Sequence, residues 1–95
     1  MPSIGVLTLE LRLDDSHSLK DKRQVVKSLK DRLRHKFNVS VAEIDYQDVW
    51  QRALLAAVTV SSAHSHAESV LQNVEQETAT LVGPMLVSAN VEWIE

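Results

Sequence analysis

The stretch FNVSVAEIDYQDVWQRALLAAVTV, residues 37 to 60, contains two β-type segments separated by a short polar interruption. Residues 37–45 are rich in β-branched side chains, whereas residues 49–60 form a long and mostly apolar run. The YQD sequence between them is typical of a turn. Because the connection is so short, the pattern predicts a hairpin of two antiparallel strands.

The segment before this hairpin predicts an amphipathic helix over about residues 19–36. Its apolar side chains recur at spacings of three and four, as they do on one side of an α-helix. Ser18 is a candidate N-cap, and Asp21 places an acid in the first turn, where helix amides are free. The inward side of the helix consists of Val25, Val26, Leu29, Leu33 and Phe37.

The segment after the hairpin predicts a second helix, which begins at Ser62 or Ser65 and runs to about Val82. Ser65 and Glu68 have the spacing of a capping box. The Gly83-Pro84 pair ends the helix, because proline cannot continue the hydrogen-bond ladder and glycine accepts a left-handed exit. The inward side of this helix consists of Ala67, Val70, Leu71, Val74, Thr78 and Leu81.

Both ends of the chain predict further strands, because IGVLTLELRL, residues 4–13, and MLVSANVEWI, residues 85–94, alternate between two sides. The order is then β-α-β-β-α-β. Right-handed crossovers assemble it into a four-stranded antiparallel sheet with two helices on one face, the ferredoxin-like α+β fold, whose central strands are residues 4–13 and 49–60. A chain of 95 residues has no material for a second core, so residues 1–95 are expected to form a single domain. One side of the last strand consists of Val87, Ala89, Val91 and Trp93.

The strand at residues 49–60 is apolar on both sides, although only one side can face the helices. This pattern indicates that a partner covers the open side of the sheet. Three of the four aromatic residues lie near strand ends, where tryptophan most often caps the core but is also favoured at protein interfaces. We therefore expect a homodimer that pairs sheet faces or edge strands about a two-fold axis. The candidate interface residues are Tyr46, Trp50, Leu55 and Trp93.

The predicted first helix carries most of the positive charge. Residues 17–36 hold eight basic and two acidic side chains, a net of +6, whereas the rest of the chain holds two basic and eleven acidic side chains, a net of −9. On a helical wheel, five cations fall within about 80° and flank the apolar side. We call these five residues, Lys20, Arg23, Lys27, Lys30 and Arg34, the basic stripe.

The basic stripe has more than one interpretation. It is either a solvated helix face that keeps a small domain in solution, or a docking surface for the phosphates of structured or ribosomal RNA; an acidic protein partner is a further alternative. RNA-recognition modules of this topology stack bases on aromatic residues in their central strands. Here the middle of both predicted central strands is aliphatic, so any RNA contact is expected to be helical and electrostatic.

Several common activities have no basis in the sequence. The absence of cysteine excludes disulfides and thiol catalysis and fits a reducing cytoplasm. The longest apolar run, ALLAAVTV, is too short to span a bilayer. Neither a Gly-rich nucleotide signature nor an ordered Ser-His-Asp set is present.

Two small clusters of polar residues are candidate sites. Glu43, Asp45 and Asp48 could gather carboxylates for a cation or an acid-base pair, but turns favour aspartate for backbone reasons alone. His64 and His66 are two residues apart, a spacing that does not place them on one helix face. The sequence thus predicts no enzyme, no catalytic residue, no metal site and no cofactor.

Parts of the chain resemble the YlxP-like family of small bacterial proteins, a domain of unknown function. The most specific matches are SLKDKR at residues 18–23, FNVSVAE at residues 37–43 and the D-x-W-Q-R-A segment at residues 48–53. The resemblance implies a ferredoxin-like domain without an established reaction. It also implies a ribosome- or RNA-related role, because such proteins are commonly encoded near translation initiation and ribosome-maturation factors.

These observations together predict a cytoplasmic, non-enzymatic accessory protein. Its expected partner is ribosomal RNA or a ribonucleoprotein, bound through the basic stripe, and no membrane is involved. The alternative is a homodimeric protein-interaction module that uses the open face of the sheet.

Overall fold

Seven segments of regular structure make up most of residues 1–94, which are the residues that the computed structural model describes. Their order confirms the predicted β-α-β-β-α-β arrangement, with one short 3-10 turn, η1, before the last strand. In chain order the segments are β1 (Ser3–Arg12), α1 (Leu19–Lys36), β2 (Ser40–Asp45), β3 (Arg52–Ser61), α2 (His64–Val82), η1 (Gly83–Met85) and β4 (Leu86–Ile94).

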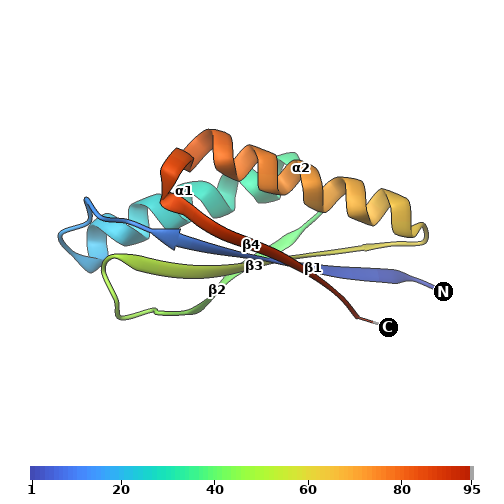
Figure 1. The fold of residues 1–95 in the computed structure, drawn as a ribbon, viewed down its shortest axis with the longest axis horizontal. Coiled ribbons are helices and arrows are strands. Elements are labelled where there is room, and N and C mark those ends of the chain that lie inside the picture. Colours follow the sequence, from blue (N-terminus) through green and yellow to red (C-terminus); the bar gives the residue numbers. More distant parts are fainter. Residues whose placement is uncertain (95) are drawn as a thin grey trace.

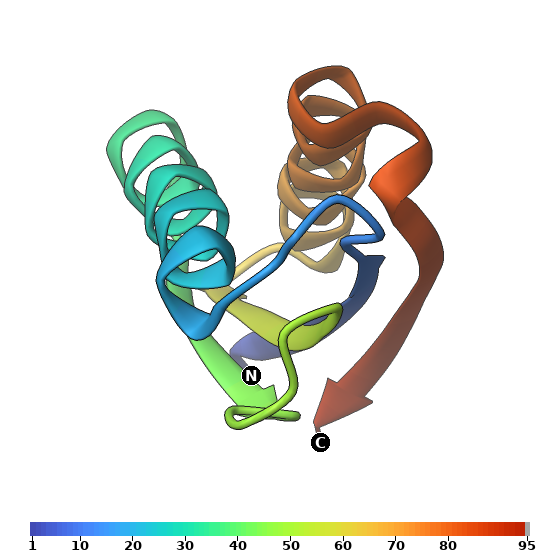
Figure 2. The ribbon, with the colours of Figure 1, turned by 90° about the vertical axis from the view of Figure 1, so that its left-hand side faces the viewer.

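The four strands form one antiparallel sheet in the order β2-β3-β1-β4, so β1 and β3 are central, as predicted. Both helices lie on the same side of this sheet, and the other side is open (Figures 1 and 2). α2 packs on β1, β3 and β4, whereas α1 packs on β2 and on α2. This is the predicted ferredoxin-like fold. Neither helix is long and apolar enough to cross a membrane.

The alternation of β1 decides which of its side chains enter the core. Leu7 and Leu9 point towards the helices and are fully buried, while the residues between them lie on the open side. β3 alternates in register with β1, so Ala57 lies opposite Leu7 and Leu55 lies opposite Leu9. Each fully buried leucine contributes about 1.5–3 kcal/mol. The helices complete the core with Val26, Leu29, Leu33, Leu71 and Val74.

Gly5 allows α2 and β4 to approach β1 closely. A Cβ atom at this position would lie 2.7 Å from Leu71 Cδ1 and 2.7 Å from Trp93 Cζ3. Carbon atoms in contact are normally about 3.5–4.0 Å apart, so a side chain here would overlap both neighbours. Glycine therefore makes room for the Trp93 ring to pack on the core.

The start of α1 agrees with the prediction and the start of α2 does not. Ser18 caps α1, because its hydroxyl accepts a hydrogen bond from the Asp21 N–H at 3.0 Å. The predicted capping box of Ser65 is wrong, since the N-cap of α2 is Ala63 and no side chain caps this end. The predicted end of α2 is confirmed at Gly83, whose φ of 55° lies in the region that favours glycine.

Two strands are shorter than the sequence predicts. β2 begins at Ser40, because the Phe37 N–H still donates to the Leu33 carbonyl and closes α1. β3 begins at Arg52, because residues 49–51 belong to the turn that follows β2. The turn is therefore longer than YQD, and its extra residues include one of the two tryptophans.

A bulge in β4 interrupts the alternation of that strand at Val87. Leu86 is opposite Leu11 and Ser88 is opposite Glu10, so Val87 is an extra residue without a partner in β1. The predicted regular alternation of Val87 with Ala89, Val91 and Trp93 is therefore interrupted at Val87, whose side chain is exposed.

Candidate functional site

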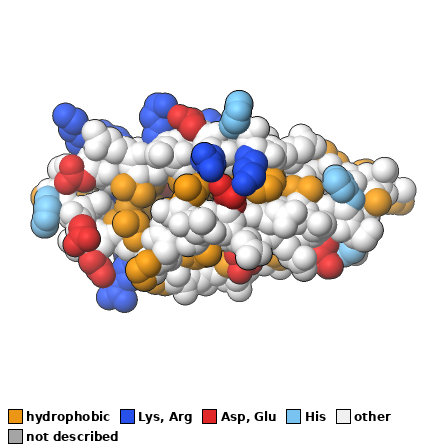
Figure 3. All heavy atoms as spheres, turned by 90° about the horizontal axis from the view of Figure 1, so that it is seen from above, with side chains coloured by type: hydrophobic (Ala, Val, Ile, Leu, Met, Phe, Trp, Pro, Cys, Tyr) orange, Lys and Arg blue, Asp and Glu red, His pale blue; other side chains and the backbone are white. Residues whose placement is uncertain are grey.

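The basic stripe borders a groove between α1 and the edge strand β2. The groove has a volume of about 310 Å³. Figure 3, which views the helix side of the molecule, shows Lys and Arg side chains gathered over α1. Lys20 lies outside the groove, nearer the start of the helix. The lining residues are Arg23, Val26, Lys27, Lys30, Asp31, Arg34 and Glu43.

Lys27 is neutralised by a carboxylate of its own helix. Its Nζ lies 2.7 Å from Asp31 Oδ2, one turn further along α1. The hydrogen bond from Lys27 holds the pKa of the Asp31 carboxyl below its usual range. Because both side chains are largely exposed, this pair is a weak one that a stronger anion can replace.

Arg34 is occupied by the backbone of β2. Its Nη2 donates a hydrogen bond of 2.6 Å to the Val41 carbonyl. Exposed edge strands present free carbonyl and N–H groups that invite pairing with other chains. Arg34 satisfies one of these groups and keeps its charge, so it also protects this edge of the sheet.

Lys20, Arg23 and Lys30 carry the unpaired charge of the basic stripe. Across residues 1–94, none of the three forms an ion pair with a carboxylate. Lys20 and Arg23 are exposed, and Lys30 is half-buried. Three of the five predicted cations are thus available to an anionic partner, and four of the five line one groove.

Two other cations of α1 join the helices to each other. Arg32 Nε lies 3.0 Å from Glu77 Oε2, and Lys36 Nζ lies 2.7 Å from Glu77 Oε1. Glu77 belongs to α2, and its side chain is only 13% exposed. The hydrogen bonds from Lys36 and Arg32 hold the pKa of Glu77 below its usual value. This cluster fixes α1 against α2 and leaves the groove side of α1 free.

Lys22 is a cation of α1 that sequence reasoning did not single out, and it is fully buried. Its Nζ lies 3.0 Å from Glu43 Oε2 and donates to three backbone carbonyls, those of Tyr46 at 2.6 Å, Gln47 at 3.2 Å and Arg52 at 3.3 Å. All three carbonyls belong to the β2–β3 turn or its end. Lys22 therefore fixes this turn to the first helix.

A signal for this role was present in the sequence. Lys22 precedes Val26 by four residues and Leu29 by seven, which places it on the inward side of α1. A charge at an inward position requires a buried partner. Glu43 supplies it, because it follows inward-facing Val41 by two residues on β2.

The comparisons with known proteins agree with this fold. A family model described as a protein of unknown function, DUF503, matches residues 4–90. The chain belongs to the DUF503 family. The uncharacterized protein YlxP of Bacillus subtilis (strain 168) is 45% identical to it over 71 residues, which cover 75% of this chain and 77% of that protein.

Solved structures with little sequence similarity share the fold of this DUF503 chain. The designed protein Foldit4 matches with a TM-score of 0.61 at 9% identity, over 100% of this chain and 98% of that one. A dimeric ferredoxin-like protein of unknown function from Thermobifida fusca matches with a TM-score of 0.55 at 14% identity, over 98% of this chain and 90% of that one. Both the predicted family and the predicted fold are thus confirmed.

The candidate interface residues of this DUF503 chain lie in different places. Leu55 is fully buried on the helix side of β3, so its prediction as an interface residue is wrong. Trp93 is half-buried, packs on the core and contacts His64, with ring centres 4.1 Å apart and ring planes tilted by 44°. Tyr46 is half-buried beneath the Arg52 guanidinium, 4.1 Å from its ring centre.

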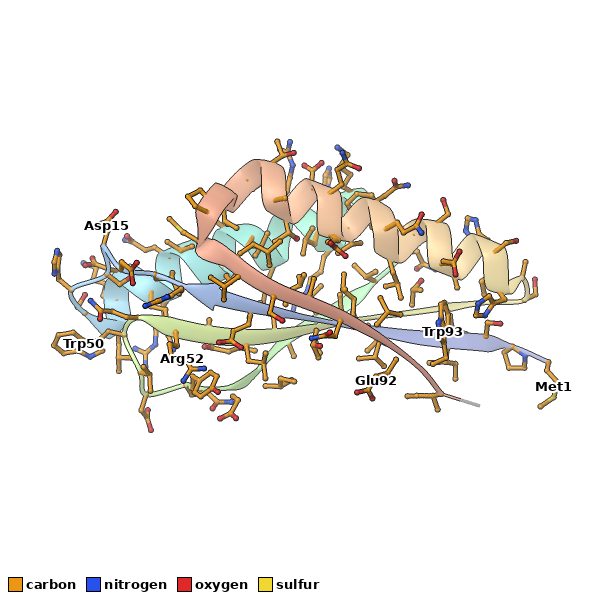
Figure 4. All side chains as sticks on the ribbon, in the orientation of Figure 1. Met1, Asp15, Trp50, Arg52, Glu92 and Trp93 are labelled. Atoms are coloured by element: carbon orange, nitrogen blue, oxygen red, sulfur yellow. The ribbon has the colours of Figure 1, made fainter. Side chains whose placement is uncertain are left out.

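Trp50 is the most exposed of the candidate interface residues, with 51% of its surface accessible. It lies at the same end of the molecule as Asp15 and Arg52 (Figure 4). Trp50 belongs to the turn between β2 and β3 and not to a strand.

The open face of the sheet is apolar along its two central strands. The residues of β1 and β3 that alternate with the core are partly or fully exposed, and Ile94 of β4 lies beside them. Arg52 and Glu10 form an ion pair of 2.8 Å at one end of this face. The hydrogen bond that the Arg52 guanidinium donates to the Glu10 carboxylate raises the pKa of Arg52. The apolar members are Ile4, Val6, Leu54, Ala56, Val58 and Val60.

The acidic and histidine clusters do not form a common site. A bulge between Glu43 and Asp45 shifts the register, so that Glu43 lies opposite Leu55 and Asp45 lies opposite Leu54. Glu43 is also paired with Lys22. The Asp45 carboxylate accepts a hydrogen bond from the N–H of Tyr46. Within residues 1–94, no group of three His, Asp or Glu side chains could hold a metal ion.

Proposed function

We propose that this chain is a cytoplasmic, non-enzymatic accessory protein that binds structured RNA, such as ribosomal RNA, through the basic stripe. The observation that supports this proposal most directly is the groove beside α1, where four cations of the stripe converge. Lysine and arginine side chains bind phosphate without reading base sequence. The RNA is therefore recognised by its backbone and its shape.

The strength of this contact follows from the pairing of the cations. If the three unpaired cations each contact one phosphate, the slope of log K against log salt on a duplex is about −0.9 × 3, or about −2.7. If Lys27 and Arg34 also exchange their partners for phosphates, the slope becomes about −4.5. The net charge of −9 outside residues 17–36 repels a long polyanion, which favours a contact limited to the basic stripe.

Filter binding to ribosomal RNA tests the proposal. Neutralising the three unpaired cations removes about 0.7 log unit of affinity for each at about 0.15 M salt, or about 100-fold in all. A control variant reaches the same net charge by adding three acids to the exposed side of α2, and its affinity should change far less. Equal losses in the two variants would contradict a local contact. The neutralised residues are Lys20→Gln, Arg23→Gln and Lys30→Gln, and the control changes are Gln72→Glu, Asn73→Glu and Gln76→Glu.

The second candidate function is that of a protein-interaction module that forms a homodimer through the open face of the sheet. The apolar side chains on that face support it, because an exposed apolar sheet face is otherwise costly in water. The dimeric Thermobifida fusca protein of the same fold is consistent with it.

Sedimentation at tens of micromolar tests the dimer. The chain has a mass of 10.6 kDa, and the proposal expects a species of twice that mass. Val58→Lys, on the open face, should yield the monomer, whereas Gln72→Lys, on the exposed side of α2, should not. A monomeric wild-type protein would exclude this second function.

A further inference from the structure

The β2–β3 turn presents an exposed apolar surface at one end of the molecule. Trp50 is 51% exposed, and Ile44 and Val49 are exposed to a similar degree. Trp50 lies at the end of the molecule opposite Met1 and Trp93 (Figure 4), and it does not line the groove beside α1. A tryptophan that only caps the core would bury its ring, as Trp93 largely does.

This turn is held in one conformation from several sides. The fully buried Lys22 ammonium donates to the carbonyls of Tyr46, Gln47 and Arg52. The Gln51 side chain donates to the carbonyls of Asp14 and Ser16 in the β1–α1 loop. The Leu13 N–H donates to the Gln51 carbonyl at 2.9 Å. The residues on both sides of Trp50 are therefore fixed to the first helix and to β1.

Tyr46 shows that the turn is held against a local preference. Its φ of 64° makes it the one residue other than glycine with a positive φ in the part of the chain that the structure describes. L-residues with bulky side chains rarely adopt this conformation. It persists here because the Asp45 carboxylate accepts from the Tyr46 N–H and Arg52 contacts both its ring and its hydroxyl. Strain of this kind concentrates at functional sites.

An exposed tryptophan on a rigid turn is suited to binding a protein. Tryptophan is the residue type most enriched at binding hot spots, because one ring removes a large area from water. A partner that binds a turn already fixed in position does not have to order it, so less of the contact energy is lost.

The charges around Trp50 indicate which kind of partner fits. Asp14, Asp15 and Asp48 are exposed in the same turn and in the loop tied to it by Gln51. Arg12 lies 3.6 Å from Asp14, whereas Asp15 and Asp48 form no ion pair within residues 1–94. These carboxylates repel a phosphate group placed directly beside them. A protein pocket with an apolar floor and a Lys or Arg border is complementary to it.

We propose that Trp50 anchors a second docking site, which inserts into an apolar, basic-bordered pocket of a partner protein. The site shares no residue with the basic stripe and does not depend on RNA binding. Lys22 acts on it as a positioning residue, since it holds the turn and does not reach the surface.

Photo-crosslinking in growing cells tests the proposal. Trp50 is replaced by the aromatic photo-reactive residue p-benzoylphenylalanine, and Leu81, 45% exposed at the end of α2, is replaced in the same way as a control. The expected result is one discrete protein adduct from position 50 that position 81 does not give. Its crosslinked peptide should map to an apolar site bordered by Lys or Arg.

The purified partner then allows a quantitative measurement. Trp50→Ala should weaken the affinity for the partner at least about 30-fold. The double variant Asp15→Asn with Asp48→Asn should weaken it several-fold. Val87→Ala, an exposed apolar control away from the turn, should change the affinity by no more than about twofold. Unchanged urea midpoints of the variants would show that the fold is intact. The proposal is overturned if position 50 gives no discrete adduct, if the adduct is RNA or a second copy of this chain, or if Trp50→Ala binds as well as the wild type.

Discussion

Replacement of Lys22 by methionine removes a buried ammonium group from among four oxygen atoms and keeps an unbranched side chain of similar length. The four oxygens are Glu43 Oε2 and the carbonyls of Tyr46, Gln47 and Arg52, all within 3.3 Å of Nζ. The Glu43 side chain is only 16% exposed, and among the described residues its Oε2 forms no hydrogen bond and is compensated by the ion pair with Lys22. Without Lys22, this carboxylate is left nearly buried and uncompensated.

The expected loss of unfolding free energy is about 3–5 kcal/mol, the cost of breaking a buried ion pair on one side. The loss of the Lys22 hydrogen bonds to the three carbonyls adds little to this cost if water reaches the turn. If water does not reach it, each unsatisfied carbonyl adds about 1 kcal/mol or more. A chain of 95 residues has a total stability of about 5–14 kcal/mol. The variant is therefore expected to be folded but marginal.

Urea unfolding followed by circular dichroism measures this loss. With a slope of about 1–1.5 kcal/mol per molar urea, the midpoint should fall by about 2–5 M. The control Lys20→Met, at an exposed position of the same helix, should change the free energy by less than about 0.5 kcal/mol. The double variant Lys22→Met with Glu43→Gln should recover part of the loss, because no charge is left unpaired. A loss below about 1 kcal/mol for Lys22→Met would refute the role assigned to this residue.

Three further changes test the packing, a charge cluster and a helix end. Gly5→Ala should destabilise the fold by about 1–3 kcal/mol, since the new Cβ overlaps Leu71 and Trp93; an unchanged thermal midpoint would contradict the close approach. The depressed pKa of Glu77 stabilises the fold above its unfolded value of about 4.3, and this contribution is lost as pH falls through the lower folded pKa. Stability measured from pH 6 to pH 3 should therefore fall less steeply in Glu77→Gln than in the wild type, and parallel profiles would show that the cluster contributes nothing. Ser18→Ala removes the α1 cap and should cost about 1 kcal/mol in urea unfolding, whereas Ser65→Ala, which caps nothing, should cost far less.

The sequence was sufficient for the fold because its strongest patterns are local. The alternation around Leu7 and Leu9 and the three-four spacing of Val26, Leu29 and Leu33 specify the elements directly. Once these elements and their order are known, the handedness of crossovers leaves few topologies. The helix cap at Ser18 is equally local.

What the sequence could not decide depends on contacts between distant segments. The side of β3 that faces the helices was ambiguous in the sequence. Both sides of that strand carry apolar side chains, so the alternation does not show which side enters the core. The register with β1, which places Leu55 opposite Leu9, resolves it. The bulge at Val87 and the uncapped start of α2 at Ala63 also lack a local signal.

The candidate site shows the same division. The angular grouping of the basic stripe is a property of one helix and was visible in the sequence. The pairing of Arg34 with the Val41 carbonyl depends on where β2 lies. The burial of Lys22 required the turn after β2 to return to α1, although its inward position on the helical wheel marked it as exceptional.

The most direct test of the account is the salt dependence of wild-type binding to ribosomal RNA, measured between about 0.05 and 0.2 M salt. Three unpaired cations, with Lys27 and Arg34 able to join them, predict a slope of log K against log salt between about −2.7 and −4.5. A slope flatter than about −2, or no measurable binding over this range, would contradict the proposal that the basic stripe binds RNA.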